Sequence, residues 1–317
     1  MSLTGQRGLT EMHVQAPKSV VMIRPHHFRS NPETRGDNAF QTENIGDVSA
    51  TARAEFDGVV AALHSEGITV HAFDDTGTST PDSVFPNNWF STHAGGHVAV
   101  YPMYAANRRR ERRWDVIEML KADYRVQDII DYSGLEHDGL ALEGTGAMVL
   151  DHIGRVAYVA QSQRADPVLL ERFCTHFNFE PIAFDATDAK GRPVYHTNVL
   201  MAIGTHTALV GLEMISDPIK RDMVHDRLVE TGRDVIALSE DQINAFAGNA
   251  IELEGENGLV LALSSKAHEA LSPAQLSRVA ATSRVLPLSI PTLETAGGSV
   301  RCMIAGLHLS RRKTERS

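Results

Sequence analysis

The sequence contains only two cysteines, Cys174 and Cys302, in 317 residues. Two cysteines in a chain of this length exclude a disulfide framework and favour a reducing compartment. The first ten residues are polar and lack the apolar core of a signal peptide. No run approaches the ~18 apolar residues that a membrane span requires. We therefore expect a cytoplasmic protein with no membrane partner.

Basic charge is also scarce. The chain has 30 lysines and arginines against 40 aspartates and glutamates, a net charge of −10, so it lacks the basic excess of nucleic-acid-binding proteins. One basic run, 108–113, is either a solvated helical turn or part of a substrate-binding site. The spacings His-Glu-x-x-His and Cys-x-x-Cys, the Gly-x-Gly-x-x-Gly loop and the P-loop are all absent. We expect no metal ion and no cofactor.

The composition, 42% hydrophobic and 22% charged, is typical of a soluble globular protein. A pattern of two apolar strands joined by a turn recurs five times, at 87–101, 144–160, 197–212, 248–263 and 298–309. Between the copies lie helix-like stretches at 51–64, 108–121, 167–178, 218–230 and 272–280. Each is followed by a β-rich run, at 68–73, 126–130, 179–184, 234–238 and 284–290. Pro167 and the pair Ser272-Pro273 suit the first positions of helices.

The anchor positions of the copies, Asn88, Thr145, Asn198, Asn249 and Ser299, are about 50 to 57 residues apart. Because one module cannot bury its own sheet face, five of them favour a closed ring. We predict one α/β domain over 1–317, with 1–18 and 311–317 as flexible termini. The alternative is an ordinary mixed α/β domain whose spacing is coincidental.

The first turn of each copy carries polar or small residues, which a ring would place at equivalent depths near its centre. Glu143, His196 and Cys302 all lie in such turns, together with several asparagines. A carboxylate, an imidazole and a thiol in one place form a nucleophilic site. Cys302 follows a Gly-Gly-Ser turn and Arg301, whereas Cys174 lies within a helical pattern and reads as a core residue.

The order of four motifs resembles a known superfamily. They are Phe-x-x-Asn at 85–88, Leu-Glu-Gly at 142–144, His-x-Asn at 196–198 and Gly-Gly-Ser-x-x-Cys at 297–302. They are similar to the guanidine-modifying (pentein) superfamily of arginine deiminases, dimethylarginine dimethylaminohydrolases and amidinotransferases. The segments 85–89 and 101–112 look most like the citrulline-utilisation hydrolase type. The resemblance spans residues 22–302 and implies a five-bladed ββαβ propeller.

The resemblance also implies residue roles. Cys302 would be the nucleophile, His196 the general acid/base, and Glu143 the residue that orients His196 or binds substrate N–H groups. Substrate contacts would come from Phe85, Asn88 and Asn198. Arg108 or Arg109 would bind the carboxylate of an amino-acid substrate.

Two departures from the pattern bear on the substrate. Arginine deiminases usually have aspartates where this chain has Asn88 and Asn198. An amide both donates and accepts hydrogen bonds, so it matches a neutral ureido group better than a guanidinium cation. We therefore expect hydrolysis of citrulline to ornithine, ammonia and carbon dioxide.

Two alternatives stay open. One is an enzyme acting on a guanidinium, namely an arginine deiminase, a methylarginine hydrolase or an amidinotransferase. The other is a non-catalytic amino-acid sensor on the same fold. The expected partner is a small amino acid, and a homo-oligomer is compatible with the sequence.

Overall fold

The computed structural model describes residues 14–44 and 46–312. Within these residues, fifteen strands form five sheets of three strands each. In every sheet the inner strand runs antiparallel to the middle strand, which runs parallel to the outer one. The sheets, inner strand first, are β15 (Ala305–Gly306), β1 (Ser19–Pro25) and β2 (Thr69–Asp75); β3 (Phe90–His93), β4 (His97–Val100) and β5 (Asp128–Asp131); β6 (Val149–Asp151), β7 (Val156–Ala160) and β8 (Glu180–Phe184); β9 (Met201–Ile203), β10 (Thr207–Val210) and β11 (Asp234–Ala237); β12 (Ile251–Gly255), β13 (Gly258–Ser264) and β14 (Arg284–Leu288).

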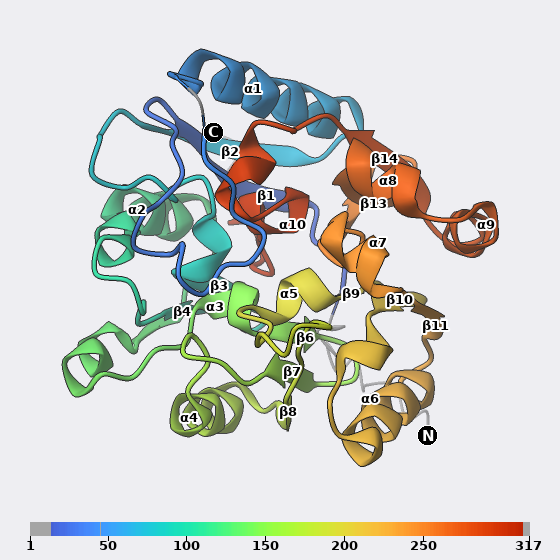
Figure 1. The fold of residues 1–317 in the computed structure, drawn as a ribbon. Helices are drawn as coiled ribbons and strands as arrows, with labels where there is room; N and C mark the ends of the chain where they lie inside the picture. The colour runs from blue at the N-terminus through green and yellow to red at the C-terminus, as the bar shows by residue number, and fades with distance from the viewer. Residues whose placement is uncertain (1–13, 45, 313–317) are drawn as a thin grey trace, which may run out of the picture.

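Each connection from a middle strand to an outer strand carries helix. These helices are α1 (Ser49–Ser65), α2 (Trp114–Asp123), α4 (Pro167–Phe177), α6 (Pro218–Glu230), and the pair α8 (Ser265–Ala270) and α9 (Pro273–Ala280). Figure 1 shows them on the outside, with the five sheets around a common centre. The α/β architecture therefore fits a pseudo-fivefold arrangement.

Short helical segments lie nearer the centre or link the modules. They are η1 (Pro86–Asn88), η2 (Arg108–Glu111), η3 (Ser133–Asp138), α3 (Gly144–Ala147), α5 (Thr197–Leu200), η4 (Leu212–Met214), α7 (Glu240–Asn244), η5 (Leu293–Ala296) and α10 (Val300–Met303). Four of them directly precede an inner strand, so the chain makes one helical turn before it enters β3, β6, β9 or β15.

Four of the five helix–strand pairs expected from the repeat are confirmed to within two residues. The helix expected at 108–121 begins only at Trp114, because Arg108–Glu111 forms a separate 3-10 turn. Local chemistry explains several helix starts. The Asp166 side chain accepts hydrogen bonds from the first turn of α4, and Asp217 does so for α6. Ser272 and Gln275 form the capping box of α9.

Two expectations about strands were wrong. The strands predicted from residues 144 and 197 begin with helical turns, α3 and α5, because an apolar run of this length does not distinguish a buried turn from a strand. The hairpin predicted at 298–309 does not form. Instead, β15 pairs with β1 through Val20 opposite Gly306 and Val21 opposite Ala305. Local sequence gives no signal of a partner almost 300 residues away.

The two ends of the described chain meet in this fifth sheet. Residues 1–13 and 313–317 lie outside the described residues, so their predicted flexibility is not addressed. Gln15 and Ala16 are buried, and the Gln15 amide donates to the carbonyls of Leu150 and Ile203, both at 3.0 Å. The prediction of a flexible terminus therefore does not extend to them.

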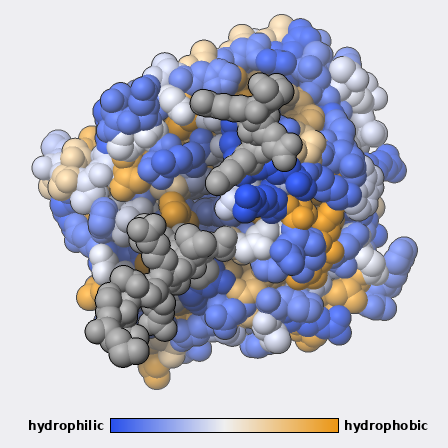
Figure 2. All heavy atoms as spheres, turned by 180° about the vertical axis from the view of Figure 1, so that it is seen from behind, coloured by the Kyte–Doolittle hydropathy of each residue, from blue (hydrophilic) through white to orange (hydrophobic). Residues whose placement is uncertain are grey.

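The surface facing away from the view of Figure 1 is mainly hydrophilic, with hydrophobic residues scattered over it (Figure 2). No helix in the described part of the chain is long and apolar enough to span a bilayer.

Candidate active site

Cys302 lies in α10 beside two asparagine amides. Nδ2 of Asn198 and Nδ2 of Asn249 each lie 3.2 Å from Sγ. Oδ1 of Asn249 also accepts a hydrogen bond from the Cys302 backbone N–H at 3.4 Å. Both asparagines are completely buried. Two N–H donors directed at one sulfur stabilise negative charge on it, as a nucleophilic thiolate requires.

His196 and Glu143 form a second buried pair. Nε2 of His196 lies 2.8 Å from Oε2 of Glu143. A carboxylate accepts hydrogen bonds only, so Nε2 carries the proton and Nδ1 holds the lone pair. Gly146 packs against this pair: a Cβ there would lie 2.9 Å from Nδ1 of His196 and 2.0 Å from Oδ1 of Asn88. The Leu-Glu-Gly-Thr-Gly segment therefore needs glycine at 146 for the imidazole to fit.

The pKa shifts of this pair follow from burial and from two nearby cations. Burial alone would raise the pKa of Glu143, but Arg164 and Arg108 outweigh it and hold the pKa well below its usual range. Burial lowers the pKa of His196 to about 4, although Glu143 acts in the opposite direction. At neutral pH the site thus holds an ionised carboxylate and a neutral imidazole.

The two cations are themselves buried and paired. Nη1 of Arg108 lies 3.2 Å from Oε2 of Glu143, and Nη1 of Arg164 lies 3.4 Å from the same atom. Arg108 also binds Glu111 in a fork, at 2.9 and 3.0 Å. Arg164 binds Asp37 in the same manner, at 2.7 and 2.5 Å. Each of the two buried cations is therefore compensated by more than one carboxylate.

Asn88 and Asp82 complete the polar wall. The Asn88 amide faces Arg108, and in the orientation that satisfies both groups its oxygen accepts from Nη2 and Nη1 at 2.9 and 3.2 Å. Oδ2 of Asp82 accepts from Nδ2 of Asn31 at 2.7 Å. Oδ1 of Asp82 is buried with no partner among the described residues. Burial raises the pKa of Asp82, against the effect of Arg108.

These groups enclose a small cavity, lined by Asn38, Asp82, Phe85, Asn88, Arg108, Arg164, Tyr195, His196, Ala296, Gly298 and Cys302. Glu143 and Asn198 support its wall from behind through their bonds to His196 and Cys302. Arg109 lies apart, with Nε donating to the carbonyl of Met103 at 3.1 Å. Seven of the eight residues predicted from the sequence are therefore brought together. No cluster of three or more metal-ligating side chains occurs in the described residues.

The segment between β1 and α1 covers the cavity. It crosses in front of the centre of the molecule as the dark-blue loop of Figure 1. Its Asp37 binds Arg164, and the Asn38 amide approaches the carbonyls of Ala296 and Gly297 at 3.4 and 3.5 Å. Only 2% of Cys302 is exposed, so the sulfur is closed to a substrate in this conformation.

Sequence reasoning did not select four residues of the site. Asn249 occupies an anchor position of the repeat, a signal that was available. Asp82 precedes the Phe-Pro-Asn-Asn motif by three residues. Arg164 and Asp37 lie in loops without repeat or motif, and nothing in the sequence pairs them.

Comparison with known proteins agrees with this geometry. Residues 24–309 match the protein family described as N,N dimethylarginine dimethylhydrolase, eukaryotic. None of the curated proteins compared matches the chain.

Several solved structures share the fold. The N-terminal domain of ArgZ, an arginine dihydrolase from the ornithine–ammonia cycle in cyanobacteria, was solved as a cysteine-to-serine mutant bound to substrate. It is 15% identical, with a TM-score of 0.72 over 91% of this chain and 97% of that one. A cysteine-to-alanine mutant of AgrE with L-arginine is 17% identical, with a TM-score of 0.70 over 91% of this chain and 40% of that one.

A third structure is a dimethylarginine dimethylaminohydrolase as its adduct with 4-chloro-2-hydroxymethylpyridine. It is 15% identical, with a TM-score of 0.64 over 92% of this chain and all of that one. Identities this low support the fold alone, whereas the family match covers most of the chain. The chain belongs to the N,N dimethylarginine dimethylhydrolase family, within the pentein superfamily of arginine-modifying enzymes.

Proposed function

We propose that this protein is a cysteine hydrolase that cleaves citrulline to ornithine, ammonia and carbon dioxide. The proposal is carried by the amides of Asn88, Asn198 and Asn249 around the sulfur and the imidazole. A neutral ureido group presents one acceptor and several donors, and amides match both. Asn198 fits this role closely, because its Nδ2 donates to Sγ while its buried Oδ1 has no partner among the described residues.

The first half of the reaction forms a covalent intermediate. The Cys302 thiol passes its proton to the free Nδ1 of His196, and the sulfur attacks the ureido carbon. Negative charge develops on the ureido oxygen, where amide N–H donors stabilise it. The resulting imidazolium is stabilised by Glu143, which is ionised and 2.8 Å from Nε2.

The second half breaks the C–N bond and then the C–S bond. His196 returns its proton to the leaving amine, so the imidazole is neutral again. A water molecule then loses a proton to His196 and attacks the carbonyl carbon of the intermediate. The C–S bond breaks and the sulfur recovers the proton. The carbamate released decomposes to an amine and carbon dioxide.

The amino-acid end of the substrate requires a cation for its carboxylate. Arg108, predicted from the sequence, lines the cavity but is already bound by Glu111 and Glu143. Arg164 also lines the cavity, and its fork holds Asp37. We infer that the substrate carboxylate replaces Asp37 on Arg164, because a fork of this geometry binds carboxylates in two parallel hydrogen bonds. Binding of the substrate carboxylate would then release Asp37 and open the covering segment in the same step.

A guanidinium substrate is the second candidate. Oδ1 of Asp82 is buried, has no partner among the described residues and belongs to a cavity-lining side chain. With Glu143 it offers a second carboxylate, which a cation favours. The AgrE mutant crystallised with L-arginine is consistent with this candidate.

We also propose that the five sheets close into a ring. Neighbouring inner strands contact each other at β6 with β9, β9 with β12, and β15 with β3. Pairing of β15 with β1 joins the two ends of the described chain, as closure of a ring requires.

The test is release of ammonia, methylamine, citrulline and ornithine by the purified protein with citrulline, arginine and methylarginine in parallel, with Cys302→Ala as the blank. We expect turnover of citrulline that the variant abolishes. Turnover of arginine or methylarginine without citrulline would favour the guanidinium candidate. No turnover of any of them, with one amino acid bound per chain, would point to a sensor.

A further inference from the structure

A second cavity lies further along the inner strands than the active site. Its lining includes Leu150 of β6, Ile203 of β9, Ile251 of β12 and Ala305 of β15, together with Arg301. It shares no lining residue with the cavity at Cys302. Its volume of about 50 Å³ admits a few water molecules or one small ion, and is far too small for an amino acid. We call it the rear cavity.

Arg301 is the cation of the rear cavity, and it has no anionic partner among the described residues. Its one side-chain hydrogen bond there runs from Nη1 to the carbonyl of Ile304, at 3.1 Å. A guanidinium has five N–H donors, so most of its hydrogen-bonding capacity is available to a ligand. Burial lowers the pKa of Arg301 to about 10, the direction expected of a cation without a counter-charge.

The three arginines that are more fully buried than Arg301 differ from it in this respect. Arg108, Arg164 and Arg233 are each at most 3% exposed, and each contacts a carboxylate. The acidic side chain in the rear cavity, Glu252, is already engaged. It accepts hydrogen bonds from the backbone and hydroxyl of Thr205, both at 2.6 Å, and from other groups. It is not within ion-pair distance of Arg301.

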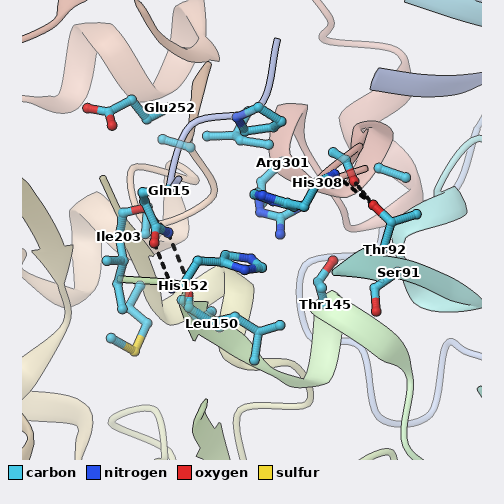
Figure 3. A pocket seen from close by; sticks show the side chains of 18 of the residues that line it. Gln15, Ser91, Thr92, Thr145, Leu150, His152, Ile203, Glu252, Arg301 and His308 are labelled. Carbon is cyan, nitrogen blue, oxygen red and sulfur yellow. Dashed lines mark hydrogen bonds between the residues drawn. The ribbon is translucent and has the colours of Figure 1, made fainter. Parts of the chain in front are cut away.

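Two histidine rings lie beside Arg301 (Figure 3). The rings of His152 and His308 stack with centroids 3.8 Å apart. Burial and then the charge of Arg301 lower the pKa of His308 to about 4. The pKa of His152 is lowered well below its usual value by burial, His308, His93, Arg155 and Arg301. A neutral imidazole has one N–H to donate, and because the backbone of Val14 already engages His308, His152 is the ring that can donate to a ligand. Gln15 lies at the other side of the cavity.

We propose that the rear cavity is a binding site for one small inorganic monoanion, such as chloride or bicarbonate, held by the guanidinium of Arg301 next to His308 and His152. The anion supplies the counter-charge of Arg301, which no described residue provides.

The direct test is a crystal of the wild-type protein soaked in sodium bromide, with anomalous diffraction at the bromine edge. We expect one strong peak beside the Arg301 guanidinium. In solution, calorimetric titration with sodium chloride and with sodium bicarbonate, at constant ionic strength in sodium gluconate, distinguishes the two sources. Gluconate is too large for the cavity and serves as the reference anion.

The variant Arg301→Met should weaken binding of the preferred anion at least tenfold, and Arg301→Lys should retain part of it. The matched control is Arg110→Met, which removes an exposed arginine. If Arg301→Met does not fold, the bromide peak in the wild type and the titration of Arg301→Lys still test whether an anion binds at Arg301. Absence of the peak, or equal binding by Arg301→Met and the wild type, would overturn the proposal and leave water as the occupant.

Discussion

Nδ2 of Asn198 donates to Sγ of Cys302 at 3.2 Å, and the oxygen of the same amide is buried without a partner among the described residues. One side chain thus supports the nucleophile and keeps an acceptor free. A carboxylate at this position would lose the donor and place negative charge beside the sulfur. The amide at 198 is therefore the simplest point at which to test nucleophile support and substrate choice together.

Replacing Asn198 with Asp should lower kcat/KM for citrulline by a factor of about 10²–10³, the effect of losing one donor aimed at developing charge. Activity with arginine, relative to citrulline, should rise, because a carboxylate matches a cation. The measurement is ammonia release from both substrates. Asn257→Asp, at an exposed turn, is the matched control and should change neither rate. An unchanged citrulline rate in Asn198→Asp would remove Asn198 from the site.

Replacing Glu143 with Gln tests the electrostatics of the site. Glu143 is the shared partner of His196, Arg108 and Arg164, so its loss should destabilise the fold by about 3–5 kcal/mol. Its charge and hydrogen bond raise the pKa of His196 against burial. The variant should therefore shift the acid limb of kcat/KM to lower pH while lowering kcat. An acid limb that moves to higher pH would contradict this assignment.

The pH dependence of stability follows from the same histidine. The pKa of His196 is about 4 in the folded protein and ~6.5 in an unfolded chain. Between these values the unfolded state binds more protons, so the contribution of His196 to stability is complete above pH ~6.5 and is lost as the pH falls toward 4. In His196→Gln, the free energy of unfolding from urea titrations should fall less steeply between pH 6.5 and 4.5 than in the wild type. Identical slopes would mean that His196 does not titrate in this way.

The two cysteines should differ sharply toward iodoacetamide. Burial raises the pKa of Cys174 to about 12, so its thiolate is scarce at neutral pH. Cys302 has two N–H donors on its sulfur. We expect one label per chain at pH 7.5, retained in Cys174→Ala and absent in Cys302→Ala, as read by mass spectrometry. Labelling of Cys174 at a comparable rate would contradict the assignment of Cys302 as the activated thiol.

The parts of the fold that could be predicted are those encoded locally. The outer helices α4, α6 and α9 begin with side-chain caps, so their bounds followed closely from the sequence, whereas α2 has no such cap and its start was misplaced. The C-terminal hairpin was wrong because β15 finds its partner in β1, and a pairing over nearly the whole chain leaves no local pattern. The helical turns α3 and α5 were predicted as strands because four consecutive buried residues fit the periodicity of a helix as well as that of a strand.

The residues of the candidate site also fall into those that the sequence could predict and those that it could not. Glu143, His196, Asn198 and Cys302 each lie at the start of a repeat, so their convergence followed from the repeat itself. Arg164 and Asp37 come from loops, and their pairing depends on how the segment after β1 folds over the centre. No repeat position marks them, which is why the structure was needed to find the covering segment.

The Asp37–Arg164 pair should control access to Cys302. Asp37 is partly exposed and Arg164 keeps Glu143 as a partner, so Asp37→Asn should cost less stability than Glu143→Gln. It should nevertheless speed alkylation of Cys302 severalfold, because the pair holds the covering segment closed. The matched control is Glu43→Gln, which breaks an exposed pair with Arg35 in the same segment. Its alkylation rate should equal that of the wild type.

If both variants react at the wild-type rate, some other contact, such as Asn38 against Gly297, keeps the segment closed. If a saturating substrate protects Cys302 in the wild type and in Asp37→Asn alike, Arg164 is free to bind the substrate carboxylate in both.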